Sequence, residues 1–166
     1  MKKKICLITG ATSGIGEACA RKFAQGGYDL ILTGRRKEKL SQLAQELKGK
    51  DVNVLPLVFD VRNYEEAKEA IDRLPEEWTA IDILINNAGL ARGLEPLQEG
   101  CLDDWNEMID TNIKGLLTMI RLIVPGMVAR NHGHIINIGS VAGDAAYAGG
   151  NVYCATKSAV KAISDG

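Results

Sequence analysis

Apolar positions along this chain fall into two alternating patterns. Short, nearly continuous apolar runs are typical of buried strands, and longer segments with apolar residues every three or four positions are typical of amphipathic helices. The runs predict strands at residues 5–9, 28–33, 52–59 (interrupted near Pro56), 81–86 and 135–138. The periodic segments predict helices at residues 15–25, 37–48, 64–74, 103–127 and from 151 onward.

The helix expected at residues 103–127 has signals at both ends. Asp103 and Asp104 stand at its start, where negative charge complements the helix dipole, and this explanation is preferred to a catalytic pair of carboxylates. Pro125 is expected to kink or end the helix, because proline lacks the backbone N–H that continues it.

The expected strands are nearly continuous apolar runs rather than strict alternations, as in 81–86 (IDILIN). Strands of this kind, separated by helices, predict an α/β fold in which helices cover both faces of a parallel sheet. Right-handed crossovers make such a sheet doubly wound. We expect residues 1–166 to form a single domain, because 166 residues suffice for one sizeable core and no repeat or linker is visible.

Charge and hydropathy narrow the class of protein. The chain has 20 basic and 21 acidic residues, a net charge of -1, which argues against binding to nucleic acid or to a membrane surface. No apolar stretch approaches the length expected of a membrane helix. The apolar run after Met1–Lys4 is too short for a signal peptide, so we expect a cytoplasmic protein.

No metal site or disulfide is expected. The four cysteines are scattered without a Cys-x-x-Cys pair and are interpreted as small buried apolar residues. His132 and His134 allow a metal pair, but they are better explained as residues of a loop and a strand start.

A glycine-rich turn, Thr9–Gly16 (TGATSGIG), follows the first strand and opens the first helix. Gly10 permits a tight turn, Gly14 permits close approach of the backbone to a phosphate, and Gly16 permits close packing of helix on strand. The helix N-terminus then offers free N–H groups and a positive dipole to a diphosphate. Its position makes a nucleotide cofactor site more plausible than an ordinary turn, and no Gly-Lys-Ser/Thr follows that would indicate a Walker A loop.

Two arginines follow the second strand in Thr33–Arg36. A site for NAD(H) commonly has an acid here, which binds the ribose hydroxyls, whereas the 2′-phosphate of NADP(H) requires positive charge. Guanidinium groups match phosphate oxygens well. Arg35 and Arg36 therefore predict NADP(H) rather than NAD(H).

Tyr153 and Lys157 lie four residues apart on the last predicted helix, so they share one face. A nearby ammonium favours the phenolate and lowers the pKa of Tyr153 toward working pH, which prepares it as a general acid or base. Such a pair alone is common and carries little weight. Here Ser140 stands thirteen residues upstream and the cofactor turn is present as well.

Taken together, these motifs resemble the classical short-chain dehydrogenase/reductase family. The resemblance covers nearly the whole chain, and its pieces run in the family order: Thr9–Gly16, Asp60, Asn86–Gly89 (NNAG), Asn112, Ser140, Tyr153 and Lys157. It implies a Rossmann-like doubly wound sheet with strand order 3-2-1-4-5. It also implies an oxidoreductase that acts on a small molecule.

The resemblance implies roles for four catalytic residues. Tyr153 would exchange the proton of the substrate oxygen, and Ser140 would hydrogen-bond the same oxygen and stabilise its developing charge. Lys157 would lower the pKa of Tyr153 and hold the nicotinamide ribose. Asn112 would hold a water molecule in a proton relay to Lys157.

It also implies the residues that bind the cofactor. The glycine-rich turn would hold the diphosphate, the two arginines the 2′-phosphate, and the segment after the third strand the adenine. The full set is Gly10, Ala11, Thr12, Ser13, Gly14, Ile15, Arg35, Arg36, Asp60, Val61, Asn87, Tyr153 and Lys157.

Several stretches look closer to one branch, the NADP-dependent 3-hydroxy acid dehydrogenases, which include serine and allo-threonine dehydrogenases. Residues 33–36, 109–112, 130–140 and 147–153 carry this likeness, and the last stretch would line the substrate pocket. Arg92 is a candidate partner for a substrate carboxylate, with a plain surface position as the alternative. Two other functions stay open: a 3-oxoacyl carrier-protein or other carbonyl reductase, and a non-catalytic NADP-binding protein.

The chain departs from the family by ending at Gly166, inside the helix that carries Tyr153. Family members continue with two more strands and a loop that closes over the substrate. We expect the sequence to be part of a longer protein; a protein that ended here would have an uncovered edge strand and little or no turnover. The resemblance further implies a homodimer or homotetramer paired through residues 103–127 and the last helix.

Overall fold

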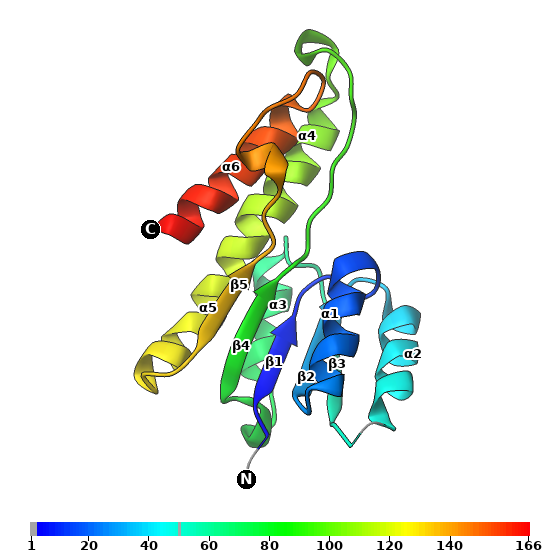
Figure 1. The fold of residues 1–166 in the computed structure, drawn as a ribbon, viewed down its shortest axis with the longest axis vertical. Coiled ribbons are helices and arrows are strands. Elements are labelled where there is room, and N and C mark those ends of the chain that lie inside the picture. The colour runs from blue at the N-terminus through cyan, green and yellow to red at the C-terminus, as the bar shows by residue number, and fades with distance from the viewer. Residues whose placement is uncertain (1–2, 50) are drawn as a thin grey trace.

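Five parallel strands form one sheet in the order β3-β2-β1-β4-β5 in the computed structural model, which describes residues 3–49 and 51–166 (Figure 1). This confirms the expected sheet and its strand order. The strand bounds are β1 Ile5–Ile8, β2 Asp29–Gly34, β3 Val54–Val58, β4 Ile81–Asn86 and β5 His134–Asn137.

Helices cover both faces of this sheet. One face is covered by α1 and α2, and the other by α3 and α5, while α6 packs against α4. The bounds are α1 Gly14–Gln25, α2 Lys37–Lys48, α3 Tyr64–Asp72, α4 Leu102–Ile109, α5 Leu116–Ala129 and α6 Asn151–Asp165.

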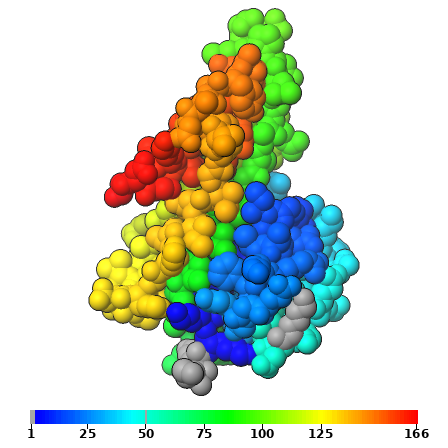
Figure 2. Space-filling model, in the orientation of Figure 1, coloured from blue at the N-terminus to red at the C-terminus, as the bar shows by residue number. Residues whose placement is uncertain are grey.

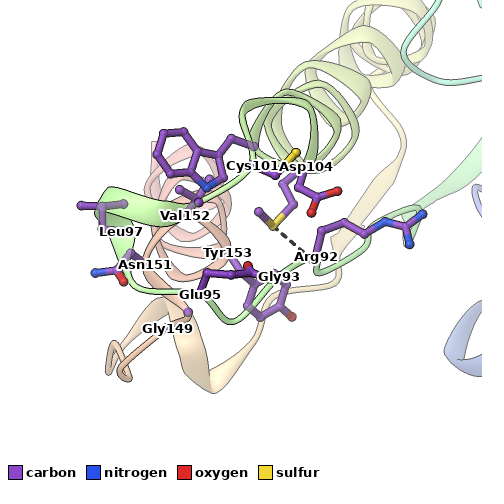
Figure 3. Close-up of a pocket in the computed structure, with 14 residues that line it drawn as sticks. Arg92, Gly93, Glu95, Leu97, Cys101, Asp104, Gly149, Asn151, Val152 and Tyr153 are labelled. Atoms are coloured by element: carbon purple, nitrogen blue, oxygen red, sulfur yellow. Dashed lines mark hydrogen bonds between the residues drawn. The ribbon is translucent and has the colours of Figure 1, made fainter.

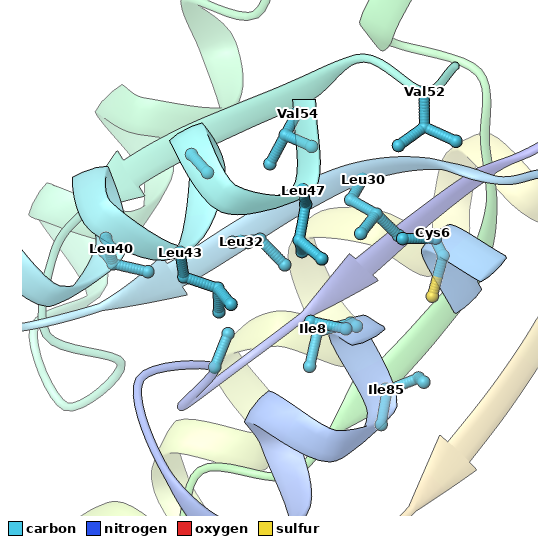
Figure 4. Close-up of a cluster of buried hydrophobic side chains, with 14 residues drawn as sticks. Cys6, Ile8, Leu30, Leu32, Leu40, Leu43, Leu47, Val52, Val54 and Ile85 are labelled. Carbon is cyan, nitrogen blue, oxygen red and sulfur yellow. The ribbon is translucent and has the colours of Figure 1, made fainter. Parts of the chain in front are cut away.

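Alternation along β1 divides the core between these two layers. Cys6 and Ile8 pack under α1 and α2 together with the buried face of α2, which includes Leu47 (Figure 4). Ile5 and Leu7 face the opposite way and pack under α3 and α5. The central strands β1 and β2 are therefore buried on both sides, as their continuous apolar runs predicted, whereas the first residues of the edge strand β5 are exposed.

The structure contradicts one prediction about proline and part of a second. β3 runs through Pro56, which pairs with Leu32 of β2, because β3 lies at the edge of the sheet and needs backbone partners on one side only. The helix continues past Pro125 to Ala129, so Pro125 does not end it, and the expected kink stays a prediction. Between α4 and α5 it widens into a π-helical turn, Asp110–Gly115, that the sequence pattern did not predict.

The same helix corrects the expectation that no apolar stretch approaches the length of a membrane helix. Residues 102–129 form 28 helical residues with mean hydropathy 1.3 over the most apolar stretch, so length and composition alone permit a membrane span. Met119, Ile123 and Met127 instead pack on the sheet within this chain. Buried core helices have the same composition, so this helix is weak evidence for a membrane segment.

The expectation for the cysteines holds only in part. Cys6 and Cys154 are buried, and burial raises the pKa of the Cys6 thiol. Cys101 is exposed at the N-terminus of α4, and Cys19 is half-buried. His134 begins β5, as expected, and the described residues contain no cluster of three or more metal-ligating side chains.

Candidate active site

A cavity of about 600 Å³ lies at the carboxyl ends of the strands. The loop after β4 and the segment that leads into α6 project beyond the rest of the molecule on this side (Figures 1 and 2). Every cofactor-binding residue predicted from the sequence lines the cavity except Ala11, which is fully buried behind the turn. Lining residues that the sequence did not predict are Gly34, Phe59, Ala88, Gly89, Leu90, Ala91, Thr111, Ile138 and Gly139.

The turn after β1 needs glycine at three positions for different reasons. Gly10 has φ +63°, and a Cβ there would lie 2.9 Å from Ala88 Cα. Gly14 has φ +57° and no atom within 4 Å of its Cβ position, so the backbone stands open to the cavity. At Gly16 a Cβ would lie 2.5 Å from the Gly10 carbonyl oxygen, so α1 must approach the turn closely. The start of α1 thus faces the cavity, as the motif predicted.

Thr9 and Asn87 hold this turn against the end of β4. The Thr9 hydroxyl oxygen accepts hydrogen bonds from the backbone N–H of Asn87 at 3.0 Å and of Ala88 at 2.9 Å. The Asn87 amide group donates to the carbonyl oxygens of Thr9 at 2.9 Å and Gly10 at 3.1 Å. Asn87 therefore shapes the turn as well as lining the cavity, and the sequence motif indicated only the second role.

The two predicted phosphate-binding arginines differ in their partners. Arg36 donates to the hydroxyl oxygens of Thr12, at 2.6 Å and 3.0 Å, and of Ser13 at 2.7 Å. Arg35 instead lies 3.6 Å from a carboxylate oxygen of Asp60 and 3.7 Å from one of Glu107. Arg36 thus interacts with uncharged groups at the turn, whereas Arg35 forms ion pairs with two acids.

Tyr153 and Lys157 lie on α6 and both line the cavity. Lys157 is only 7% exposed, and its Nζ donates a 2.7 Å hydrogen bond to the carbonyl oxygen of Ile138 at the end of β5. Burial lowers the pKa of the Lys157 ammonium. The carbonyl fixes the amine at the cavity wall, and the electrostatic effect of this amine on the phenol stays a prediction.

Asn112, in the π-helical turn, joins the loop after β4 to α6. Its side chain accepts from Leu90 N at 2.9 Å and donates to Leu90 O at 2.9 Å and to the Thr156 hydroxyl at 3.0 Å. Thr156 in turn donates to the carbonyl oxygen of Tyr153 at 2.7 Å. Both amide protons of Asn112 are used in these bonds, and its predicted relay to Lys157 stays a prediction.

Ser140 does not line the cavity, although its neighbours Ile138 and Gly139 do. Its hydroxyl oxygen accepts a 3.2 Å hydrogen bond from Ala142 N at the start of a short 3-10 turn. The structure therefore brings Tyr153 and Lys157 together in the cavity and leaves Ser140 at its border.

A smaller groove lies on the other side of Tyr153, between the loop after β4 and the start of α6 (Figure 3). Its volume is about 20 Å³, room for roughly one water molecule. Residues 149–153 line it, and the expected role of residues 147–153 in a substrate pocket stays a prediction. Arg92 also contributes, but its guanidinium points away from the groove and binds Glu107 at 3.0 Å.

The sheet order, the glycine turn and the cavity that holds Tyr153 and Lys157 together define a Rossmann-like, dinucleotide-binding architecture. The sequence profile of the short chain dehydrogenase family matches residues 4–166, and the chain belongs to this family.

Among its relatives, the NADP-dependent 3-hydroxy acid dehydrogenase YdfG of Escherichia coli (strain K12) is 55% identical over 160 residues, 96% of this chain and 63% of the relative. Sulfoacetaldehyde reductase 2 of Chromohalobacter salexigens is 49% identical over 158 residues, 95% of this chain and 62% of the relative. A solved structure, the closed form of serine dehydrogenase complexed with NADP+, is 55% identical with a TM-score of 0.90, and the match covers 96% of this chain and 63% of that one. The chain thus spans about 63% of the length of these relatives.

Proposed function

We propose that the protein is an NADP(H)-dependent dehydrogenase that oxidises the 3-hydroxyl group of a short 3-hydroxy acid and reduces the corresponding 3-oxo compound. The observation that carries this proposal is the 600 Å³ cavity, which joins the glycine turn and both arginines to Tyr153 and Lys157. Relatives that are named for NADP and for 3-hydroxy acids support it.

The cavity fits this cofactor. The open space at Gly14 leaves room for a diphosphate beside the start of α1, where the helix dipole favours negative charge. Arg35 and Arg36 would hold the 2′-phosphate, and the end of β3 at Asp60 and Val61 would hold the adenine. Asn87 would contact the adenosine side, and Tyr153 and Lys157 the nicotinamide ribose. When bound, the cofactor would supply the hydride chemistry at its nicotinamide, beside Tyr153 and Lys157.

The proton is handled by the protein. Tyr153, as phenolate, would take the proton of the substrate hydroxyl, and Lys157 would stabilise that phenolate from its position at the cavity wall. Ser140 would donate its hydroxyl proton to the reacting oxygen, since its hydroxyl oxygen only accepts in the bond from Ala142 N. Asn112 would support a water relay to Lys157 while it positions α6 through Thr156.

The substrates that we propose are serine, allo-threonine, 3-hydroxyisobutyrate and 3-hydroxypropionate. The likeness to a sulfoacetaldehyde reductase makes a small oxo acid with a sulfonate a further member of the same class. A cytoplasmic location and a homodimer or homotetramer stay predictions from the family resemblance.

A substrate screen tests this proposal. NADP+ reduction by the full-length protein should be observed with at least one of the four hydroxy acids and be lost in Tyr153→Phe. Activity in Tyr153→Phe would contradict the acid/base role. Failure with all four acids, with carbonyl reduction of acyl thioesters instead, would favour a carrier-protein reductase. NADPH binding without any turnover would favour a non-catalytic binding protein.

A further inference from the structure

Glu107 of α4 lies at the centre of an ion-pair network beside the cofactor cavity. Its carboxylate contacts three arginines from different parts of the chain: Arg92 at 3.0 Å, Arg62 at 3.5 Å and Arg35 at 3.7 Å. The Glu107 side chain is only 21% exposed, whereas those of the arginines are 33% to 54% exposed. This carboxylate is thus the shared, inner member of the network.

Asp60 is the second acid of the network and has its own cation. Arg62 donates to both carboxylate oxygens of Asp60, with a shortest distance of 2.6 Å, and its backbone N–H donates at 3.0 Å. Partial burial opposes ionisation of Asp60, but these bonds outweigh it and hold the pKa of Asp60 below its ordinary value. Asp60 is therefore ionised at neutral pH and largely neutralised by Arg62.

These contacts create a problem for Arg35. A 2′-phosphate that binds Arg35 comes within a few ångströms of two carboxylates, and like charges at that range repel strongly in a partly buried site. Arg62 already neutralises the charge of Asp60. Glu107 is then the remaining acid, and Arg35 would have to neutralise it if no other cation did. Arg92 has the shortest contact with Glu107, although Arg92 itself does not line the cofactor cavity.

We propose that Arg92 determines cofactor selectivity indirectly, because it neutralises Glu107 and so leaves the charge of Arg35 available for a 2′-phosphate. This inference rests on the proposed use of NADP(H). It gives Arg92 a positioning role through Glu107, in place of the substrate-carboxylate contact considered from the sequence. That replacement agrees with its guanidinium, which points away from the groove beside Tyr153 (Figure 3).

Dissociation constants of NADPH and NADH, measured on the full-length protein by fluorescence titration, test the proposal. Arg92→Gln should weaken NADPH binding about three-fold to five-fold, the upper part of the range expected for one partly exposed ion pair, and leave NADH binding within experimental error. The loss should shrink as salt is raised, because salt screens exposed charges. Arg92→Lys keeps the charge and should bind NADPH nearly as the wild type does.

The carboxylate partner of Arg92 provides the decisive control. Removing Glu107 in the double variant Arg92→Gln/Glu107→Gln should restore NADPH affinity to within about two-fold of the wild type, since the two charges act as a pair. Arg73→Gln removes a cation of the same type from the end of α3, where it pairs with Glu69, and should change neither dissociation constant.

Each outcome separates the inference from the proposed function. Selective NADPH binding by the wild type together with unchanged NADPH affinity in Arg92→Gln would overturn the inference alone. The inference would fail equally if Arg92→Gln weakened NADH as much as NADPH, or if the added Glu107→Gln change did not rescue NADPH binding. A wild-type protein that binds NADH as well as NADPH would overturn the proposed cofactor, and the inference with it.

Discussion

The unequal partners of Arg35 and Arg36 predict unequal contributions to NADPH binding. Arg36 donates hydrogen bonds to the hydroxyls of Thr12 and Ser13 at the turn. Because these groups are uncharged, the full positive charge of Arg36 is available to a 2′-phosphate. A charge-assisted hydrogen bond is worth about 1.5 to 3 kcal/mol, so Arg36→Ala should raise the Kd of NADPH roughly 10-fold to 150-fold.

Arg35 must give up part of its interaction with Asp60 and Glu107 before it binds phosphate. These ion pairs are long, at 3.6 Å and 3.7 Å, and more than half of the Arg35 side chain is exposed, so each is worth at most about 1 kcal/mol. If that cost is about 1 kcal/mol in total, about 0.5 to 2 kcal/mol remains, so Arg35→Ala should raise the Kd of NADPH only about 2-fold to 30-fold.

Fluorescence titration of the full-length variants with NADPH and NADH measures both effects. NADH affinity should change little, because NADH lacks the 2′-phosphate. Thermal melting provides the control for a loosened turn in Arg36→Ala, since Arg36 also bridges Thr12 and Ser13. Equal losses for NADPH and NADH, with unchanged melting, would refute the assignment of these arginines to the 2′-phosphate. A larger effect at Arg35 than at Arg36 would refute the argument from their partners.

Three further predictions concern the rest of the site. Tyr153→Phe should abolish turnover and leave the dissociation constant of NADPH, measured by fluorescence titration, within a few-fold of the wild type. Retained turnover would contradict the acid/base role. Asn112→Ala should lower the free energy of unfolding by about 2 to 4 kcal/mol in urea titrations, because Leu90 and Thr156 lose buried hydrogen bonds; a loss under about 0.5 kcal/mol would contradict the joining role. The lowered pKa of Asp60 means that its stabilisation is present above its ordinary value of 3.8 and is lost as pH falls through the lower folded-state value. Asp60→Asn should therefore flatten acid unfolding curves in that range, and identical curves would show that the carboxylate contributes nothing.

Much of the fold was predictable because local pattern and tertiary packing agree. The helix Lys37–Lys48 and the strand Ile81–Asn86 have the predicted bounds, since strong periodicity in one and a continuous apolar run in the other leave little choice. The interruption expected at Pro56 and the helix end expected at Pro125 were wrong for the opposite reason. The tolerance of these prolines depends on the edge position of β3 and on packing of α5 against the sheet, neither of which is visible locally.

The site also combines features that local sequence motifs predict with features that arise only in the folded chain. The glycine turn and the Tyr153–Lys157 spacing are local motifs, and the structure brings them to one cavity. Glu107 gave no local signal, because its partners come from the ends of β2, β3 and β4 and meet it only in the folded chain. The position of Ser140 outside the cavity depends likewise on the 3-10 turn that it caps.

The central claim is that Lys157, held at the cavity wall by Ile138, assists Tyr153 as the acid/base of the proposed reaction. The rate of NADP+ reduction by the full-length protein, measured as a function of pH, tests it most directly. The same measurement on Lys157→Met is compared with the wild type by the shape of the pH profile, not by the maximal rate. We expect the wild-type rate to rise across neutral pH and the Lys157→Met profile to move to higher pH by at least about one unit. Profiles of the same shape in both proteins would contradict the claim.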